Sequence, residues 1–92
     1  MAYTLTHNPD ESRYEYHIDG HIAYITYLQQ GDNMHLTHTI VPDPLSGKGL
    51  ARMLLEDVLE VIKKEGKKAV AECSYVVRYQ EKNPEKSDYF AN

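Results

Sequence analysis

The chain has 92 residues, and its 10 basic against 14 acidic side chains leave a formal charge of −4. This length predicts one domain over residues 1–92. The mild acidity and the lack of a basic block exclude a dedicated nucleic-acid binder. The single cysteine excludes an internal disulfide and any zinc site with two thiolates. Because no apolar run reaches 18 residues and residues 1–10 lack a secretion signal, we expect no membrane partner and a cytoplasmic location.

Residues 3 to 41 carry the signals of an antiparallel meander. Alternating side chains between turn-forming residues predict four strands, at Tyr3–His7, Arg13–Ile18, His21–Gln30 and Met34–Val41. Asp19-Gly20 predicts a type I′ hairpin turn, because that turn needs a positive φ at both central residues. The third predicted strand has apolar side chains on both faces, so we expect a sheet that is covered on both sides.

The apolar period changes from two to about 3.6 after this meander. It predicts a long helix that begins at Leu50 and ends at Gly66. Lys68–Cys73 is typical of a short buried strand, parallel to the fourth predicted strand through a right-handed crossover. Ser74 can cap a shorter helix over Tyr75–Lys82. We therefore predict an α+β domain, an antiparallel meander followed by a βαβ unit and a short C-terminal helix.

A loop with two glycines, Gly47-Lys48-Gly49, leads directly into the long helix. The first amides of a helix lack internal partners and carry partial positive charge, and glycines let a bulky anion come close. This pattern suits a phosphate or a diphosphate. The spacing is neither that of a Walker loop nor that of a Rossmann fingerprint. The alternative is that the glycines only permit a tight loop before the helix.

The segment Leu45–Ala51 resembles the acetyl-CoA-binding motif of the GCN5-related N-acetyltransferases, [QR]-x-x-G-x-[GA]. Ser46, Gly49 and Ala51 align with its three fixed positions, and Ser46 departs from the Gln or Arg of the motif. The resemblance extends to the small, single-domain YjdJ-like branch of this family. It follows the chain in order through three further segments: Asp19–Tyr27, His38–Pro42, and Cys73–Tyr79 before Asn83-Pro84.

The resemblance implies a minimal fold of that family, with acetyl-CoA as donor substrate. It implies that pantetheine pairs with the backbone of Thr39, Ile40 and Val41, where two parallel strands part. It places the diphosphate on the loop and first helical turn, with charge added by Lys48 or Arg52; these residues are Ser46, Gly47, Lys48, Gly49, Leu50, Ala51 and Arg52. The acyl thioester would then end near Cys73.

Three side chains are candidates for the chemistry of acyl transfer. Tyr79 resembles the tyrosine that lies near the CoA sulfur in this family and is a candidate acid, although a packing role beside Tyr75 is an alternative. Cys73 is a candidate acyl acceptor, or only a small buried side chain. His38 is a candidate base, or a hydrogen-bonded imidazole with no chemical role.

The other histidines do not predict a metal site. His35 and His38 are three apart on one predicted strand, so we expect them on opposite faces. His17 and His21 flank a hairpin turn, but no third ligand is evident near them.

We predict an acetyl-CoA-dependent N-acetyltransferase that acts on an unknown amine. Direct attack by the amine is favoured over a covalent route through Cys73. The alternative is a CoA-binding or acyl-CoA-binding module without catalysis. Larger relatives have further helices and strands that help to form the acceptor pocket. We therefore expect an open acceptor side, which suits a large or exposed amine or a wall supplied by another subunit, and the chain could be a monomer or a homodimer.

Overall fold

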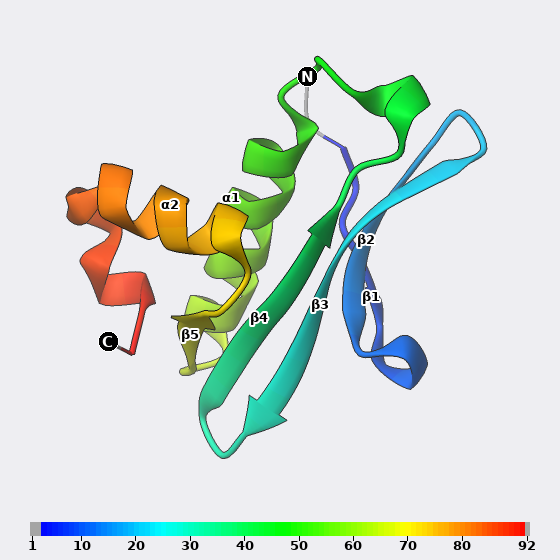
Figure 1. Cartoon of the computed structure of the whole chain (residues 1–92). Coiled ribbons are helices and arrows are strands. Elements are labelled where there is room, and N and C mark those ends of the chain that lie inside the picture. Colours follow the sequence, from blue (N-terminus) through cyan, green and yellow to red (C-terminus); the bar gives the residue numbers. More distant parts are fainter. Residues whose placement is uncertain (1–2, 92) are drawn as a thin grey trace.

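The computed structural model describes residues 3–91, which form one mixed sheet with two α-helices (Figure 1). The strands follow chain order across the sheet: β1 (Thr6–Asn8), β2 (Arg13–Ile18), β3 (His21–Gln30), β4 (Asn33–Ile40) and β5 (Lys68–Ala71). The first four pair antiparallel, and β5 is parallel to β4. The α-helices are α1 (Leu50–Lys64) and α2 (Ser74–Lys82), and 3-10 turns are η1 (Pro9–Glu11), η2 (Asp43–Leu45) and η3 (Pro84–Tyr89). The predicted α+β fold is confirmed.

The β2–β3 hairpin lies where the turn residues Asp19-Gly20 predicted it. Asp19 has φ 51° and Gly20 has φ 78°, as a type I′ turn requires, and both strands have the predicted bounds. Other bounds differ from the prediction. The first strand is Thr6–Asn8 rather than residues 3–7, β4 is shifted one residue earlier, and β5 ends two residues earlier, at Ala71. The second helix begins at Ser74, so Cys73 and not Ser74 occupies its N-cap position.

The core lies between α1 and one face of the sheet, here called the helix face. The sheet contributes Tyr14, Tyr16, Ala23, Ile25 and Leu36, and α1 contributes Leu54, Leu55, Val58, Leu59 and Ile62. The opposite, open face carries Tyr24, Thr26 and Leu28 on β3, and Leu28 is 55% exposed. Ile40, which pairs with Tyr24, is also exposed, at 41%. The expectation of a sheet covered on both sides is therefore wrong.

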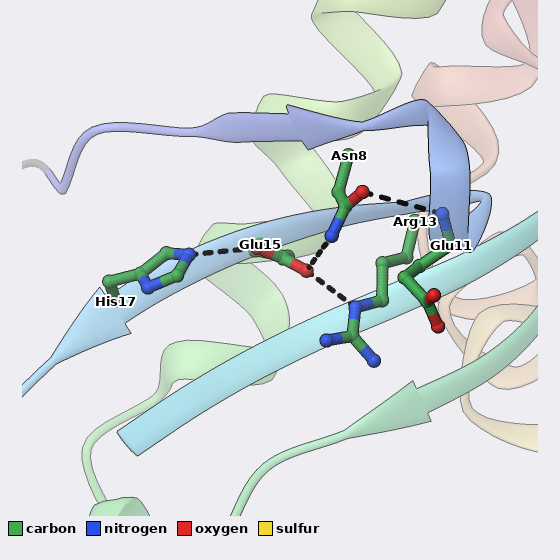
Figure 2. Close-up of polar contacts among 5 residues, drawn as sticks. All are labelled: Asn8, Glu11, Arg13, Glu15 and His17. Atoms are coloured by element: carbon green, nitrogen blue, oxygen red, sulfur yellow. Dashed lines mark hydrogen bonds and ion pairs between the residues drawn. The ribbon is translucent and has the colours of Figure 1, made fainter. Parts of the chain in front are cut away.

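One carboxylate is buried on the β1–β2 edge of the open face. Glu15 is only 3% exposed and accepts hydrogen bonds from Asn8 Nδ2 at 3.0 Å and Arg13 Nε at 2.5 Å (Figure 2). His17 Nε2 lies 2.8 Å from its other oxygen. Burial alone would raise the pKa of Glu15, but the three hydrogen bonds outweigh it and lower the pKa to about 2. Glu15 is thus a buried carboxylate whose oxygens are hydrogen-bonded, and through Asn8 it joins β1 to β2.

The end of the described chain returns to the sheet. After α2 and η3, Phe90 forms a parallel bridge with Ala69 of β5, and the amide of Ala91 donates to the Ala69 carbonyl at 2.8 Å. Phe90 is buried, as part of the core. In residues 3–91, neither α-helix has the length and apolar character needed to cross a membrane.

Candidate functional site

Strands β4 and β5 separate midway along β4. Their parallel pairing runs from Asn33 with Lys68 to Leu36 with Ala71. The amides of Glu72 and Cys73 then both donate to the Leu36 carbonyl, at 3.3 and 3.0 Å. Beyond that point β4 continues to Ile40 beside β3, and no other strand of the described chain lies on its β5 side. The backbone edge from residue 37 onward is therefore open. Thr39, Ile40 and Val41, the residues expected to pair with pantetheine, lie along or directly after this edge.

A bulge in β4 changes which side chains share a face. Thr26 pairs with His38 and Tyr27 pairs with Leu36, so Thr37 is an extra residue. His35 pairs with Leu28, and Thr26 and Leu28 point to the same face of β3. His35 and His38 therefore both lie on the open face. The expectation that they face opposite ways is wrong, because the alternation of side chains is interrupted by the bulge.

Each of these two histidines has a polar partner. His35 Nδ1 is hydrogen-bonded to a carboxylate oxygen of Glu72, directly where β5 leaves the sheet. His38 Nδ1 lies 3.3 Å from the hydroxyl of Thr26. Sequence reasoning missed the His35–Glu72 pair, because it joins residues 37 positions apart across a strand pairing. Among residues 3–91, no group of three or more His, Cys, Asp or Glu side chains could hold a metal ion.

The loop between β4 and α1 presents backbone rather than side chains. Residues 46–49 are exposed, while Leu45 before them is buried in the core. The Ser46 hydroxyl donates to the Asp43 carbonyl at 2.8 Å, which fixes the end of η2. Gly47 (φ 78°) and Gly49 (φ 71°) have left-handed backbone, and a Cβ atom at either would meet nothing within 4 Å. The two glycines therefore allow the left-handed backbone of the loop, and the space next to their Cα atoms is open.

The amides of this loop and of the first turn of α1 are free. Gly49 is the N-cap of α1, and no side chain caps the helix. The first amide with a partner is that of Met53, which donates to the Gly49 carbonyl at 3.2 Å. Within the described chain, the amides of residues 47–52 donate to no other group. Lys48 and Arg52 are exposed at either end of this row of donors. A helix terminus with free amides and nearby cations can bind an anion such as a diphosphate.

Cys73 lies where the open edge of β4 meets the start of α2. Its Sγ is 3.6 Å from Oγ1 of Thr39, across the gap between the separating strands. Burial raises the pKa of the thiol, but hydrogen bonding with Thr39 and the amides of Val76 and Tyr75 outweighs burial, so the pKa is lower than usual. The thiolate is thus favoured relative to an ordinary cysteine.

Tyr79 is buried and bonded to the other helix. Its hydroxyl donates to Oε2 of Glu56 on α1 at 2.9 Å. Burial, the hydrogen bond and the charge of Glu56 all raise the pKa of Tyr79. Arg52 Nε donates to the same Glu56 oxygen at 3.2 Å. The side chains of Tyr79, Cys73 and His38 have different hydrogen-bond partners, so the three candidate catalytic side chains do not form one hydrogen-bonded cluster. Sequence reasoning missed Glu56, although its i,i+4 spacing from Arg52 was a signal.

An open pocket of about 170 Å³ lies between the first turn of α1 and α2. It is lined by Arg52, Tyr75, Arg78, Tyr79, Lys82 and Asn83. Of this set, the sequence analysis proposed Arg52 and Tyr79 as site residues.

Comparison with known proteins assigns this architecture to a family. The model of the GCN5-related N-acetyltransferase family matches residues 13–89. The chain also superimposes on the solution NMR structure of a GCN5-like protein from Staphylococcus aureus, with a TM-score of 0.76 and 26% identity, over 98% of this chain and 89% of that one. The chain therefore belongs to the GCN5-related N-acetyltransferase family.

The curated relatives share a shorter segment. Protein NATD1 from Gallus gallus and from Mus musculus is 39% identical over 49 residues, which cover 53% of this chain and 44% of each relative. NATD1 from Homo sapiens has the same identity, with 43% of its length covered. The aligned segment thus spans less than half the length of these relatives.

Proposed function

We propose that the protein transfers the acetyl group of acetyl-CoA to an amine. The observation that carries this proposal is the row of free amides at residues 47–52, beside the open edge of β4. Six unpaired donors at a helix start, with Lys48 and Arg52 beside them, fit a diphosphate. The open edge from Thr37 to Ile40 fits the amide groups of pantetheine, which need backbone partners.

The donor would enter with its diphosphate on this row and its thioester between the separating strands. Cys73 and Thr39 lie on either side of that gap. In direct transfer, the amine nitrogen attacks the thioester carbonyl, a base takes the proton from nitrogen, and the carbon–sulfur bond breaks. The departing thiolate then takes a proton. We assign the base to His38, on the open face, and the proton donor to Tyr79.

The open face is the side from which the acceptor would come. Neither helix of the described chain covers it, and Leu28 and Ile40 are exposed there. An uncovered face suits an amine on a large molecule, or a small amine enclosed by a second subunit. We propose direct attack as the route; in the covalent route the acetyl group would pass to Sγ of Cys73, with release of CoA, before it reaches the amine.

The test combines binding with turnover. Calorimetric titration should detect both acetyl-CoA and CoA, and release of free thiol from acetyl-CoA should rise with one or more amines from a broad panel. Binding without turnover across the panel would instead support a non-catalytic CoA-binding module. If neither ligand gives a binding signal in the titration, both the acetyltransferase and the CoA-binding module are ruled out.

A further inference from the structure

The bulge in β4 brings two consecutive residues to the same hydroxyl group. Oγ1 of Thr26 on β3 lies 2.7 Å from Oγ1 of Thr37 and 3.3 Å from Nδ1 of His38. In a regular strand, neighbouring side chains point to opposite faces, so two successive residues would not both reach Thr26. Thr37 is the extra residue of the bulge, and a bulge redirects side chains in this way. The bulge therefore creates a chain of three polar groups on β3 and β4.

The two nitrogen atoms of the His38 ring have different surroundings. Nδ1 is the atom next to the Thr26 hydroxyl. Nε2 is the far nitrogen of the ring, and His38 is exposed on the open face. An imidazole that acts as a base needs a lone pair on the nitrogen that meets the substrate. For His38 that nitrogen is Nε2, so the hydrogen of the neutral ring must be on Nδ1.

The Thr26 hydroxyl can contact Nδ1 in two ways. Either it accepts a hydrogen bond from Nδ1–H and donates its own hydrogen to Thr37, or it accepts from Thr37 and donates to an unprotonated Nδ1. Only the first arrangement stays intact after the ring takes up a proton, because both nitrogens of an imidazolium are donors. Its Nδ1–H···O bond also becomes stronger as the ring gains positive charge. The first arrangement thus stabilises the transition state of proton transfer more than the ground state.

We propose that Thr26 is a positioning residue for the base His38: it accepts the hydrogen of Nδ1 and so keeps the lone pair on Nε2. The proposal rests on the proposed function, in which His38 takes a proton from the attacking amine. In that step the N–H bond of the amine breaks, a new N–H bond forms at Nε2, and the proton later leaves to water. No proton passes through Thr26 or Thr37, whose hydroxyls only hold the ring. The bulge in β4 therefore sets which nitrogen of His38 is basic.

The kinetic test removes the hydroxyl and keeps the shape of the side chain. Thr26→Val should lower kcat for acetyl transfer by roughly tenfold and leave the KM for acetyl-CoA unchanged, because a hydrogen bond that strengthens in the transition state is lost. Thr26→Ser keeps the hydroxyl and should restore most of kcat. Thr6→Val is the matched control, because Thr6 is exposed on β1 and lies opposite Glu15 rather than His38. An unchanged kcat in Thr26→Val would contradict the proposal.

A spectroscopic measurement tests the same contact without turnover. Long-range proton–nitrogen NMR spectra of a neutral imidazole distinguish hydrogen on Nδ1 from hydrogen on Nε2, and the signals of His38 are those missing from His38→Gln. The unmodified protein and Thr26→Ser should carry the hydrogen on Nδ1, and Thr26→Val should shift it toward Nε2. Hydrogen on Nε2 in the unmodified protein would overturn the proposal and leave acetyl transfer itself intact. If the spectra change as expected but no amine is acetylated, the proposed function fails, and the base role of His38 fails with it.

Discussion

At Cys73, burial and hydrogen bonding act on the thiol in opposite directions, and hydrogen bonding dominates. Thr39→Val removes the hydroxyl that lies 3.6 Å from Sγ. The pKa of the thiol should then rise, because burial remains and one of the groups that lower it is lost. Alkylation by iodoacetamide near neutral pH should become several-fold slower, because the thiolate is the reactive form.

Thr37→Val is the control for this prediction. The Thr37 hydroxyl contacts Thr26 at 2.7 Å, not Cys73, so this variant should leave the alkylation rate unchanged. An equal rate in Thr39→Val and the unmodified protein would show that Thr39 does not influence the thiol. Intact-mass measurement after exposure to acetyl-CoA, with Cys73→Ala as reference, tests whether an acetyl group reaches Sγ.

The two histidines on the open face can be separated by substitution. If His38 is the base, His38→Gln should lower kcat/KM by roughly 100-fold or more, because the proton of the attacking amine then has no acceptor. His35→Gln should retain most of kcat/KM, because His35 lies on the same face but is bonded to Glu72. A comparable loss in His35→Gln alone would transfer the role to His35.

At the scale of elements, the loop before α1 depends on the backbone of Gly49. Gly49→Val places a β-branched side chain at φ 71° and should cost about 1–2 kcal/mol of stability. The loop would shift to relieve this strain, so acetyl-CoA affinity should fall by roughly tenfold or more. Gly31→Val is a matched control, with a similar φ of 62° and equally open space, in the β3–β4 turn. It should lose similar stability in thermal unfolding and keep its affinity.

Contact between the two helices gives a prediction about turnover. Tyr79→Phe removes the hydroxyl from Glu56, which keeps its bond to Arg52, so stability should fall by only about 1 kcal/mol. The proposed role requires that kcat for acetyl transfer decrease while the dissociation constant of acetyl-CoA changes little. An unchanged kcat would leave Tyr79 as a packing residue that joins α2 to α1.

Local sequence signals predicted most helices and strands. Features that depend on contacts between distant residues could not be predicted in this way. Asp19-Gly20 and the change of period at Leu50 are local, and the hairpin and the start of α1 lie where they were predicted. The bulge at Thr37 has no marker residue such as glycine, because it arises from pairing with β3. The glycine loop could be predicted from the sequence because glycine is the residue type that readily adopts its positive φ angles. The His35–Glu72 and Tyr79–Glu56 pairs could not, because each depends on how distant elements pack.

At the scale of the whole molecule, Glu15 makes stability depend on pH. Its pKa is about 2 in the folded protein against an ordinary value of 4.5. The unfolded chain therefore takes up this proton first, so the contribution of Glu15 is complete above about pH 4.5 and is lost as pH falls toward 2.

Glu15→Gln should reduce the free energy of unfolding at neutral pH by about 1–3 kcal/mol, because Arg13 loses its charged partner. Urea unfolding between pH 2 and 7 should show a flatter acid side for this variant than for the unmodified protein. Parallel curves would mean that other carboxylates cause the acid dependence. Glu11→Gln, an exposed carboxylate nearby, is the control.

The bridge between Phe90 and Ala69 also affects how separate molecules meet. β5 is the last strand on its side of the sheet, and an uncovered strand invites pairing with a strand of another chain. Residues 90 and 91 cover the outer backbone of β5 at Ala69 and so hinder such pairing at this position. Loss of these two contacts would leave the outer backbone of β5 exposed at Ala69 and would thus favour self-association.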